Sequence, residues 1–267
     1  MRKLDRAIAC LLAYLLPDAC IACEAALDPS ERHLCERCRA SIRAETIVTA
    51  LPGRDAAAAA PAVCTSAFRF QGAVRQLVHS LKYGGRVSVA PELARLCLFA
   101  VRQVVSSRPL MCPAEPESAA GVPLPNGNDP VTALMTEEAP RTEPEVGPVI
   151  DGIVPVPLHH ARARERGFNQ SELIARELSS LLAIPCFLAL RRVAAGRPQA
   201  SLPRDRRLAS TAGAFSAVEG RAEGLRLLLV DDVVTTGATL AEASDALVRG
   251  GALSVDCFAV AATPASS

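Results

Sequence analysis

The sequence predicts an α/β fold built on a parallel β-sheet, preceded by a small N-terminal module of a different kind. Strand and helix patterns alternate from about residue 150 onwards, which is typical of a sheet covered by helices. Half of the 267 residues are hydrophobic, so one sizeable core is available, and the net charge of +1 neither favours nor excludes a nucleic-acid partner. Four of the ten cysteines lie between residues 20 and 38, which sets the N-terminal part apart from the rest.

Residues 150–263 carry the alternating pattern. Short apolar strands are separated by amphipathic helices of about a dozen residues, and crossovers of this kind join parallel strands. We therefore expect one α/β domain here, with strands at Gly152–Pro157, Leu225–Val230 and Ser254–Ala261 and helices at Gln170–Ala183 and Thr239–Gly250.

The N-terminal module, residues 1–50, is expected to be a helix followed by a zinc ribbon. The pairs Cys20-x-x-Cys23 and Cys35-x-x-Cys38 are separated by eleven residues, which is a typical spacing for a four-thiolate zinc site. Four protein ligands close the coordination sphere, so the zinc is expected to be structural. Removing it should loosen residues 18–45 and spare the C-terminal domain. The alternative is four reduced cysteines in a core.

The first residues resemble an export signal only superficially. The apolar run Ala7–Leu16 follows Arg2 and Lys3, but Asp5 and Arg6 interrupt the approach and no small-residue cleavage site comes after the run. Its apolar residues fall on one helical face. A docking helix is therefore preferred over export. No segment reaches the ~20 apolar residues that span a bilayer, and a cytoplasmic protein is expected.

Two further segments lie between the module and the α/β domain. Residues 62–106 have the apolar spacing of two helices and are expected to pack on the α/β domain, with the turn Lys82-Tyr83-Gly84-Gly85 between them. Residues 107–149 contain nine prolines and no apolar period. We expect them to be a flexible insert, with a recognition segment as the alternative.

The candidate site follows the strand Leu225–Val230. Two carboxylates come first, and a Thr/Gly-rich turn before a helix comes next, as in a crevice beyond the carboxyl ends of parallel strands. Such a turn favours the binding of a phosphate group, because backbone N–H groups and side-chain hydroxyls meet there at a helix N-terminus. Carboxylates just before it suit the vicinal hydroxyls of a sugar. The carboxylates are Asp231 and Asp232, and the turn, hereafter the phosphate loop, consists of Thr235, Thr236, Gly237, Ala238 and Thr239.

The stretch Val230–Thr239 resembles the phosphoribosyl diphosphate loop of type I phosphoribosyltransferases. Together with four other motifs it resembles the ComF family of competence proteins, over nearly the whole chain except the insert. Ser210 departs from the family, which often has Asn there. The motifs are the two Cys-x-x-Cys pairs, Leu81-Lys82-Tyr83-Gly84-Gly85, Val154-Pro155-Val156-Pro157-Leu158 with Arg166-Gly167-Phe168-Asn169-Gln170, and Gln199-x-x-Leu202 with Gly213-Ala214-Phe215.

The resemblance implies a type I phosphoribosyltransferase fold with an N-terminal zinc ribbon. It implies binding of 5-phosphoribosyl 1-diphosphate with Mg²⁺ and transfer of the phosphoribosyl group with release of pyrophosphate. The pyrophosphate would lie in the loop after Pro157, and a closing loop at about 191–210 would cover the substrate. Lys82 stands out because only two of the 29 basic residues are lysines, and it could reach a phosphate. The basic candidates are Lys82, Arg162, Arg166, Arg204 and Arg207.

Three functions stay open at this stage. The chain is a working phosphoribosyltransferase, or a non-catalytic binding module in DNA uptake and competence, or a zinc-ribbon nucleic-acid binder with a vestigial pocket. The second function would involve competence or DNA-processing proteins, and both the second and third could involve single-stranded DNA. The chain has no Trp and 3% aromatic residues, which leaves little material for base stacking.

Overall fold

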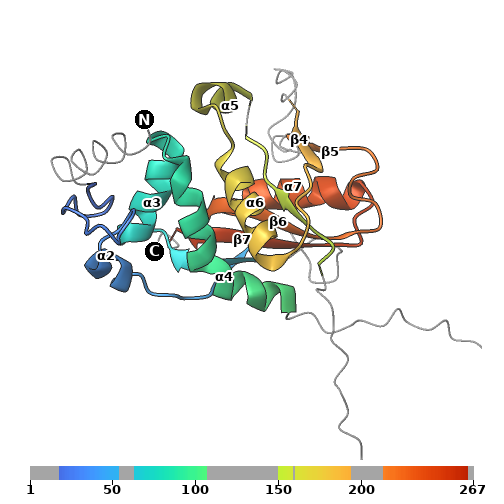
Figure 1. Cartoon of the computed structure of the whole chain (residues 1–267). Helices are drawn as coiled ribbons and strands as arrows, with labels where there is room; N and C mark the ends of the chain where they lie inside the picture. Colours follow the sequence, from blue (N-terminus) through green and yellow to red (C-terminus); the bar gives the residue numbers. More distant parts are fainter. Residues whose placement is uncertain (1–17, 54–62, 107–149, 159, 194–212, 264–267) are drawn as a thin grey trace, which may run out of the picture.

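The computed structural model describes residues 18–53, 63–106, 150–158, 160–193 and 213–263 (Figure 1). The expected N-terminal helix and the insert at 107–149 lie outside the described residues, as do Arg204, Arg207 and most of the closing loop expected at about 191–210.

A five-stranded, mostly parallel sheet forms the centre of the molecule, which confirms the α/β class. Each strand pairs in parallel with its neighbour, except the first strand of the chain, which is antiparallel at one edge. The strands lie in the order β1 (Ile47–Ala50), β2 (Val63–Arg69), β7 (Ser254–Ala262), β6 (Arg226–Val234) and β3 (Gly152–Pro155).

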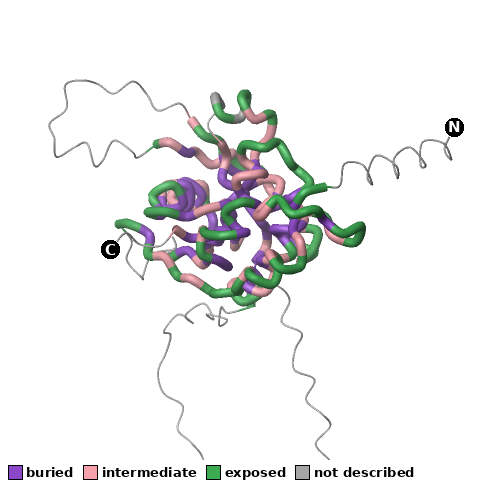
Figure 2. The backbone as a smooth tube through the Cα atoms, turned by 90° about the vertical axis from the view of Figure 1, so that its left-hand side faces the viewer, coloured by how far each residue is buried: buried purple, intermediate pink, exposed green. Residues whose placement is uncertain are grey.

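Helices cover both faces of the sheet, because alternate residues of the central strands point to opposite sides. Leu228 and Val230 pack in one core with α4 (Ala90–Ser106) and α6 (Gln170–Leu182). Leu227 and Leu229 pack in a second core with α7 (Ala238–Arg249). Figure 2 shows the buried backbone gathered in the interior between these layers. A two-stranded ribbon, β4 (Leu190–Arg192) with β5 (Phe215–Ala217), lies on the side of α7.

The sheet begins earlier in the chain than the sequence indicated. β1 lies in the part that was expected to be ribbon, and β2 precedes the expected helices. β2 pairs with β7, so it is an inner strand with residues buried on both faces. Its sequence, Val-Cys-Thr-Ser-Ala-Phe-Arg, therefore lacks the alternation that marks a half-exposed strand.

Helix α3 (Gly72–Tyr83) lies across the carboxyl edge of the sheet. It begins directly after β2, whereas Lys82 near its end contacts Asp232 on β6, and β7 lies between those two strands. Its apolar face is buried as expected, at Val74, Leu77, Val78 and Leu81. A 3-10 turn, η1 (Val87–Val89), leads from α3 to α4.

The cysteine-rich module docks on the helices rather than standing apart. Among its described residues, 18–50, one short helix is found, α2 (Glu36–Ala40). Arg39 Nη2 lies 2.6 Å from Glu92 Oε1 on α4, and His33 Nε2 lies 3.0 Å from the carbonyl oxygen of Ser88. Leu34 and Cys20 are buried in the same core as α3 and α4. The module and the sheet domain therefore share one hydrophobic core.

Within the described ranges, every helix is too short or too polar to cross a lipid bilayer.

Candidate functional site

The two carboxylates lie at the carboxyl end of β6, inside the strand rather than after it. β6 continues to Val234, four residues beyond the expected end, because Asp231 and Val233 still pair with β7. Asp231 is half-buried and Asp232 is 3% exposed. Adjacent strand residues point to opposite sides, so each carboxylate meets different neighbours.

Asp231 is held by two donors. The hydroxyl of Ser171, on the first turn of α6, donates to Asp231 Oδ1 at 2.7 Å, and the backbone N–H of Asp232 donates to the same oxygen at 2.8 Å. Burial, and next the charge of Asp232, raise the pKa of Asp231 to about 7, against the lowering effect of these two hydrogen bonds. Asp231 can therefore exchange a proton near neutral pH.

Among the residues that the structure describes, Asp232 has an ion-pair partner at one of its two oxygens. Lys82 Nζ lies 2.8 Å from Asp232 Oδ1, with the lysine side chain 18% exposed. The other oxygen, Oδ2, is buried and has no hydrogen-bond partner among the described residues. A buried carboxylate oxygen without a donor is costly. A ligand hydroxyl or a cation at this point would relieve that cost.

The phosphate loop, residues 235–239, joins β6 to α7. Gly237 caps the helix in the left-handed region, with φ of +77°, and a Cβ on it would lie 2.5 Å from Leu51 Cδ2. Glycine is therefore required both for the turn and for the close approach of Leu51. The loop is exposed apart from Gly237, and the first turn of α7 has no acidic residue, so the helix N-terminus is open to an anion.

The arginine-rich segment after β3 lies at the same edge of the sheet. The amide Nδ2 of Asn169 donates to the carbonyl oxygen of Val156 at 3.0 Å, and its Oδ1 accepts from the N–H of Ser171 at 3.2 Å, which caps α6. Arg162 is exposed on α5 (His160–Arg166). Arg166 is half-buried, and its Nη1 donates to Gln170 Oε1 at 3.1 Å.

The four cysteines converge as their spacing predicts. The sulfurs of Cys20, Cys23, Cys35 and Cys38 all lie within 4.8 Å of one another, and those of Cys23 and Cys35 are 3.6 Å apart. Zn–S bonds of about 2.3 Å in a tetrahedron place the sulfurs about 3.8 Å apart. The cluster therefore has the donors and the spacing that a structural zinc ion requires.

Two features of the site escaped sequence reasoning. Ser171 contacts Asp231 although the two are sixty positions apart in the chain, and the only local feature near it is Asn169, which caps α6 two residues earlier. Tyr83 contacts Arg166, whose guanidinium carbon lies 4.8 Å from the centre of the tyrosine ring. Lys82 was a candidate for phosphate binding, and its contact with Asp232 brings it into the site.

Comparison with known proteins identifies the family. The phosphoribosyl transferase domain family matches residues 169–267. DNA utilization protein YhgH of Salmonella typhi is 33% identical over 188 residues, which cover 70% of this chain and 66% of that protein. Competence protein F of Haemophilus influenzae is 36% identical over 131 residues, 48% of this chain and 56% of that protein. Competence protein ComFC of Bacillus subtilis is 38% identical over 107 residues, 40% of this chain and 42% of that protein. The chain belongs to the ComF family.

The family match covers one part of the site of this ComF-family chain, and the structure adds residues that lie outside the match. The matched domain begins at residue 169, so it contains both carboxylates and the phosphate loop. Lys82, Arg162, Arg166 and the cysteine cluster precede it, and their relation to the site comes from the structure. The chain covers 66% of the length of the Salmonella relative, just under two thirds.

Proposed function

We propose that this ComF-family protein binds 5-phosphoribosyl 1-diphosphate with Mg²⁺ and transfers the phosphoribosyl group to a nucleophile, releasing pyrophosphate. One observation carries the proposal. Two adjacent carboxylates, one with a buried oxygen that lacks a donor, lead directly into an exposed phosphate-binding turn at the carboxyl edge of a parallel sheet.

Each part of the substrate has a matching group along this edge. The 5-phosphate fits the phosphate loop at the N-terminus of α7, and the ribose hydroxyls donate to Asp231 and Asp232. The diphosphate fits the positive charge of Arg162 and Arg166, since a guanidinium matches phosphate oxygens with two parallel donors. The ammonium group of Lys82, beside Asp232, adds a further charge for a phosphate oxygen.

The transfer needs positioning more than a strong base. The bond between C1 of the ribose and the diphosphate oxygen breaks, and its electron pair leaves with pyrophosphate. A lone pair of the nucleophile forms the new bond to C1. Charge neutralisation of the leaving diphosphate is the chemistry that bound Mg²⁺ supplies. The residues hold the ribose and both phosphate ends in line, which lowers the barrier through orientation and charge stabilisation.

Calorimetric titration with 5-phosphoribosyl 1-diphosphate and Mg²⁺ tests this assignment. Asp231→Asn/Asp232→Asn should weaken binding at least about tenfold, because hydrogen bonds to charged groups are worth roughly 1.5–3 kcal/mol each. This variant should still bind inorganic phosphate. Thr236→Val should weaken ribose 5-phosphate and inorganic phosphate alike, because it alters the cradle and leaves the sugar contacts. Absence of any phosphoribosyl ligand binding at millimolar concentration would refute the proposal.

A second candidate is a non-catalytic binding module in DNA uptake or competence. It is favoured by the names of the relatives, which are called DNA utilization and competence proteins. Pyrophosphate release in the presence of candidate acceptor bases separates the two functions, since only the enzyme releases it. Salt-dependent binding of single-stranded DNA without turnover would favour the module.

We also propose that the cysteine cluster holds one structural Zn²⁺ through Cys20, Cys23, Cys35 and Cys38. The fit of the sulfur spacing to a tetrahedral site supports it. All four ligand positions are protein thiolates, so the metal leaves no open position for catalysis.

A further inference from the structure

Three rings and a guanidinium form a continuous row over helix α3. The rings of Phe70 and His79 are stacked with centres 5.8 Å apart, and those of His79 and Tyr83 are tilted with centres 5.5 Å apart. Arg166 continues the row, 4.8 Å from the centre of the Tyr83 ring. We call these four side chains the ring row.

The ring row is an unusual use of this chain's aromatic residues. Aromatic residues make up 3% of the sequence, and Trp is absent. All seven phenylalanines are buried or half-buried, as expected for core residues. Tyr83, in contrast, is 71% exposed. A large flat ring left in solvent, with a cation at one side, is a preferred partner for another flat group.

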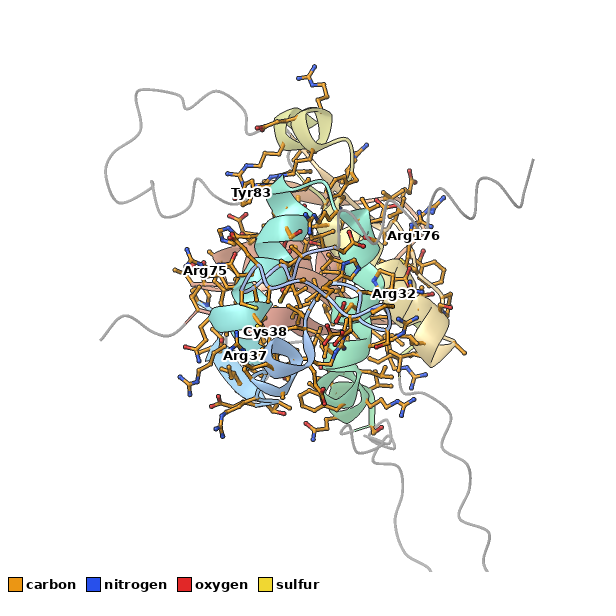
Figure 3. The ribbon with its side chains drawn as sticks, turned by 60° about the vertical axis from the view of Figure 1, so that its left-hand side comes forward. Arg32, Arg37, Cys38, Arg75, Tyr83 and Arg176 are labelled. Atoms are coloured by element: carbon orange, nitrogen blue, oxygen red, sulfur yellow. The ribbon has the colours of Figure 1, made fainter. Side chains whose placement is uncertain are left out.

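The ring row ends beside the carboxylates of the site. Lys82, the neighbour of Tyr83, contacts Asp232, and Arg166 belongs to the segment after β3 at the same edge of the sheet. Figure 3 shows Tyr83 at the end of α3 nearest to α5, with Arg75 further along the helix on the same outer side. Arg75, His79 and Tyr83 are spaced four residues apart, so they share one face of the helix.

The chemistry of the ring row selects a flat, electron-rich heteroaromatic ligand. Such a ligand can stack on Tyr83 and on the planar guanidinium of Arg166, and both contacts tolerate any base because every base has a π-face. Arg75 is exposed on the same face and supplies positive charge for a phosphate attached to the base. An aliphatic or purely anionic ligand would make no use of the rings.

We infer that the ring row is a stacking site for a nucleobase beside the phosphoribosyl site. The base comes either as a free molecule or as part of a single strand, because the stacking chemistry is the same. The role of the base as acceptor of the phosphoribosyl group rests on the proposed function. Stacking itself depends on Tyr83, His79 and Arg166.

The absence of Trp allows a direct test. Tyr83→Trp introduces the sole tryptophan of the chain at the exposed end of the row. A base that stacks on this indole quenches its fluorescence. Titration with adenine, guanine, uracil and a short single-stranded oligonucleotide should give saturable quenching by at least one of them. An oligonucleotide of the same length with abasic sites should quench much less, because it offers phosphate without bases.

Variants without the introduced tryptophan provide the matched controls, and their binding is measured by calorimetry. Tyr83→Phe should bind the quenching ligand as the wild type does, and Tyr83→Ala should bind it about tenfold or more weakly, since a stacked base loses a ring partner. Quenching by free bases identifies a free acceptor, whereas quenching by the oligonucleotide alone identifies a strand. Absence of quenching by all of them, or equal affinity of Tyr83→Ala and Tyr83→Phe, overturns the stacking site.

The same variants separate this inference from the proposed function. Tyr83→Ala should bind inorganic phosphate at the phosphate loop as the wild type does, because the ring contacts of Tyr83 are with His79 and Arg166. If the wild type does not bind phosphoribosyl diphosphate, the proposed function is refuted and the stacking result is unaffected. Loss of quenching alone refutes the stacking site.

Discussion

At the level of single side chains, the charge balance of the site depends on the pair of Lys82 and Asp232. Asp232 is almost fully buried, and Lys82 is its only charged partner in the described structure at hydrogen-bonding distance. Removing one member of such a pair leaves a buried charge, which costs about 3 kcal/mol or more. Lys82→Met should therefore lower the free energy of unfolding by about that amount in urea denaturation.

The double variant Lys82→Met/Asp232→Asn is the control for this expectation. It removes both charges, so most of the lost stability should return. If Lys82→Met and the double variant were equally unstable, the loss of stability would come from packing of the lysine stem, and the ion pair would contribute nothing to stability.

The raised pKa of Asp231 makes stability depend on pH near neutrality. An aspartate in an unfolded chain titrates near 3.9, whereas the pKa of Asp231 in the folded protein is about 7. Between these values the folded state holds one more proton, so stability falls as pH rises towards 7 and the full penalty is present above it. From pH 6 to pH 8 the wild type should lose about 1 kcal/mol more than Asp231→Asn. Urea denaturation of both proteins at the two pH values measures this difference, and parallel behaviour would contradict it.

Sequence reasoning reached the residues that lie together along the chain and missed those that folding brings together. Asp231, Asp232 and the phosphate loop form one continuous string, so their proximity was readable. The contact of Ser171 with Asp231 depends on the position of α6 against β6, and no local pattern encodes it. The stacking of Phe70 on His79 likewise depends on how the turn before α3 is folded.

At the level of elements, the turn between β6 and α7 depends on Gly237 for two separate reasons. Its φ of +77° strains any other residue, and a Cβ there would collide with Leu51. Gly224 is a matched control, since its φ is +70° and a Cβ would have nothing within 4 Å. Gly224→Ala should therefore cost about 1–2 kcal/mol from backbone strain alone.

Gly237→Ala should cost clearly more than Gly224→Ala and should also weaken inorganic phosphate binding, because the loop must move away from Leu51. Thermal unfolding and phosphate titration of both variants measure the two effects. Equal destabilisation by the two changes would show that the contact with Leu51 relaxes freely.

The elements that sequence patterns revealed are those with a clear period. α3, α4, α6 and α7 have apolar residues at helical spacing, and β6 and β7 each contain an apolar run, at residues 227–230 and 257–262, so their positions followed from local sequence. β2 is short, contains Thr and Ser, and is buried by pairing with a strand from the far end of the chain. The path of α3 across the carboxyl edge also depends on long-range packing, so it could not be predicted.

At the level of the whole molecule, the cysteine module and the sheet domain should lose stability together. We expected removal of zinc to spare the C-terminal domain, but Cys20 and Leu34 share a core with Leu77 and Leu81 of α3. The double change Cys35→Ser/Cys38→Ser should therefore abolish about one equivalent of bound zinc and also increase amide hydrogen exchange in α3 and α4.

Hydrogen exchange by mass spectrometry, with elemental analysis of the same samples, measures both effects. Cys64→Ser is the control, because Cys64 is a buried thiol of the second core, away from the metal cluster. Zinc retained at full stoichiometry in the double variant would contradict the metal site. An increase in amide hydrogen exchange that is confined to residues 18–45 would contradict the shared core.

The pairing of β2 with β7 also has a consequence for how the protein is made. In the register of the two strands, Cys64 of β2 lies opposite Cys257 of β7, which is 193 positions later in the chain. A ribosome adds roughly 5–20 residues each second, so about 10–40 s pass between synthesis of the two strands. During this time β2 has no parallel partner, and its apolar side chains stay open to wrong contacts. We therefore expect the N-terminal third, although it is synthesised first, to complete its fold only after β7 has been synthesised.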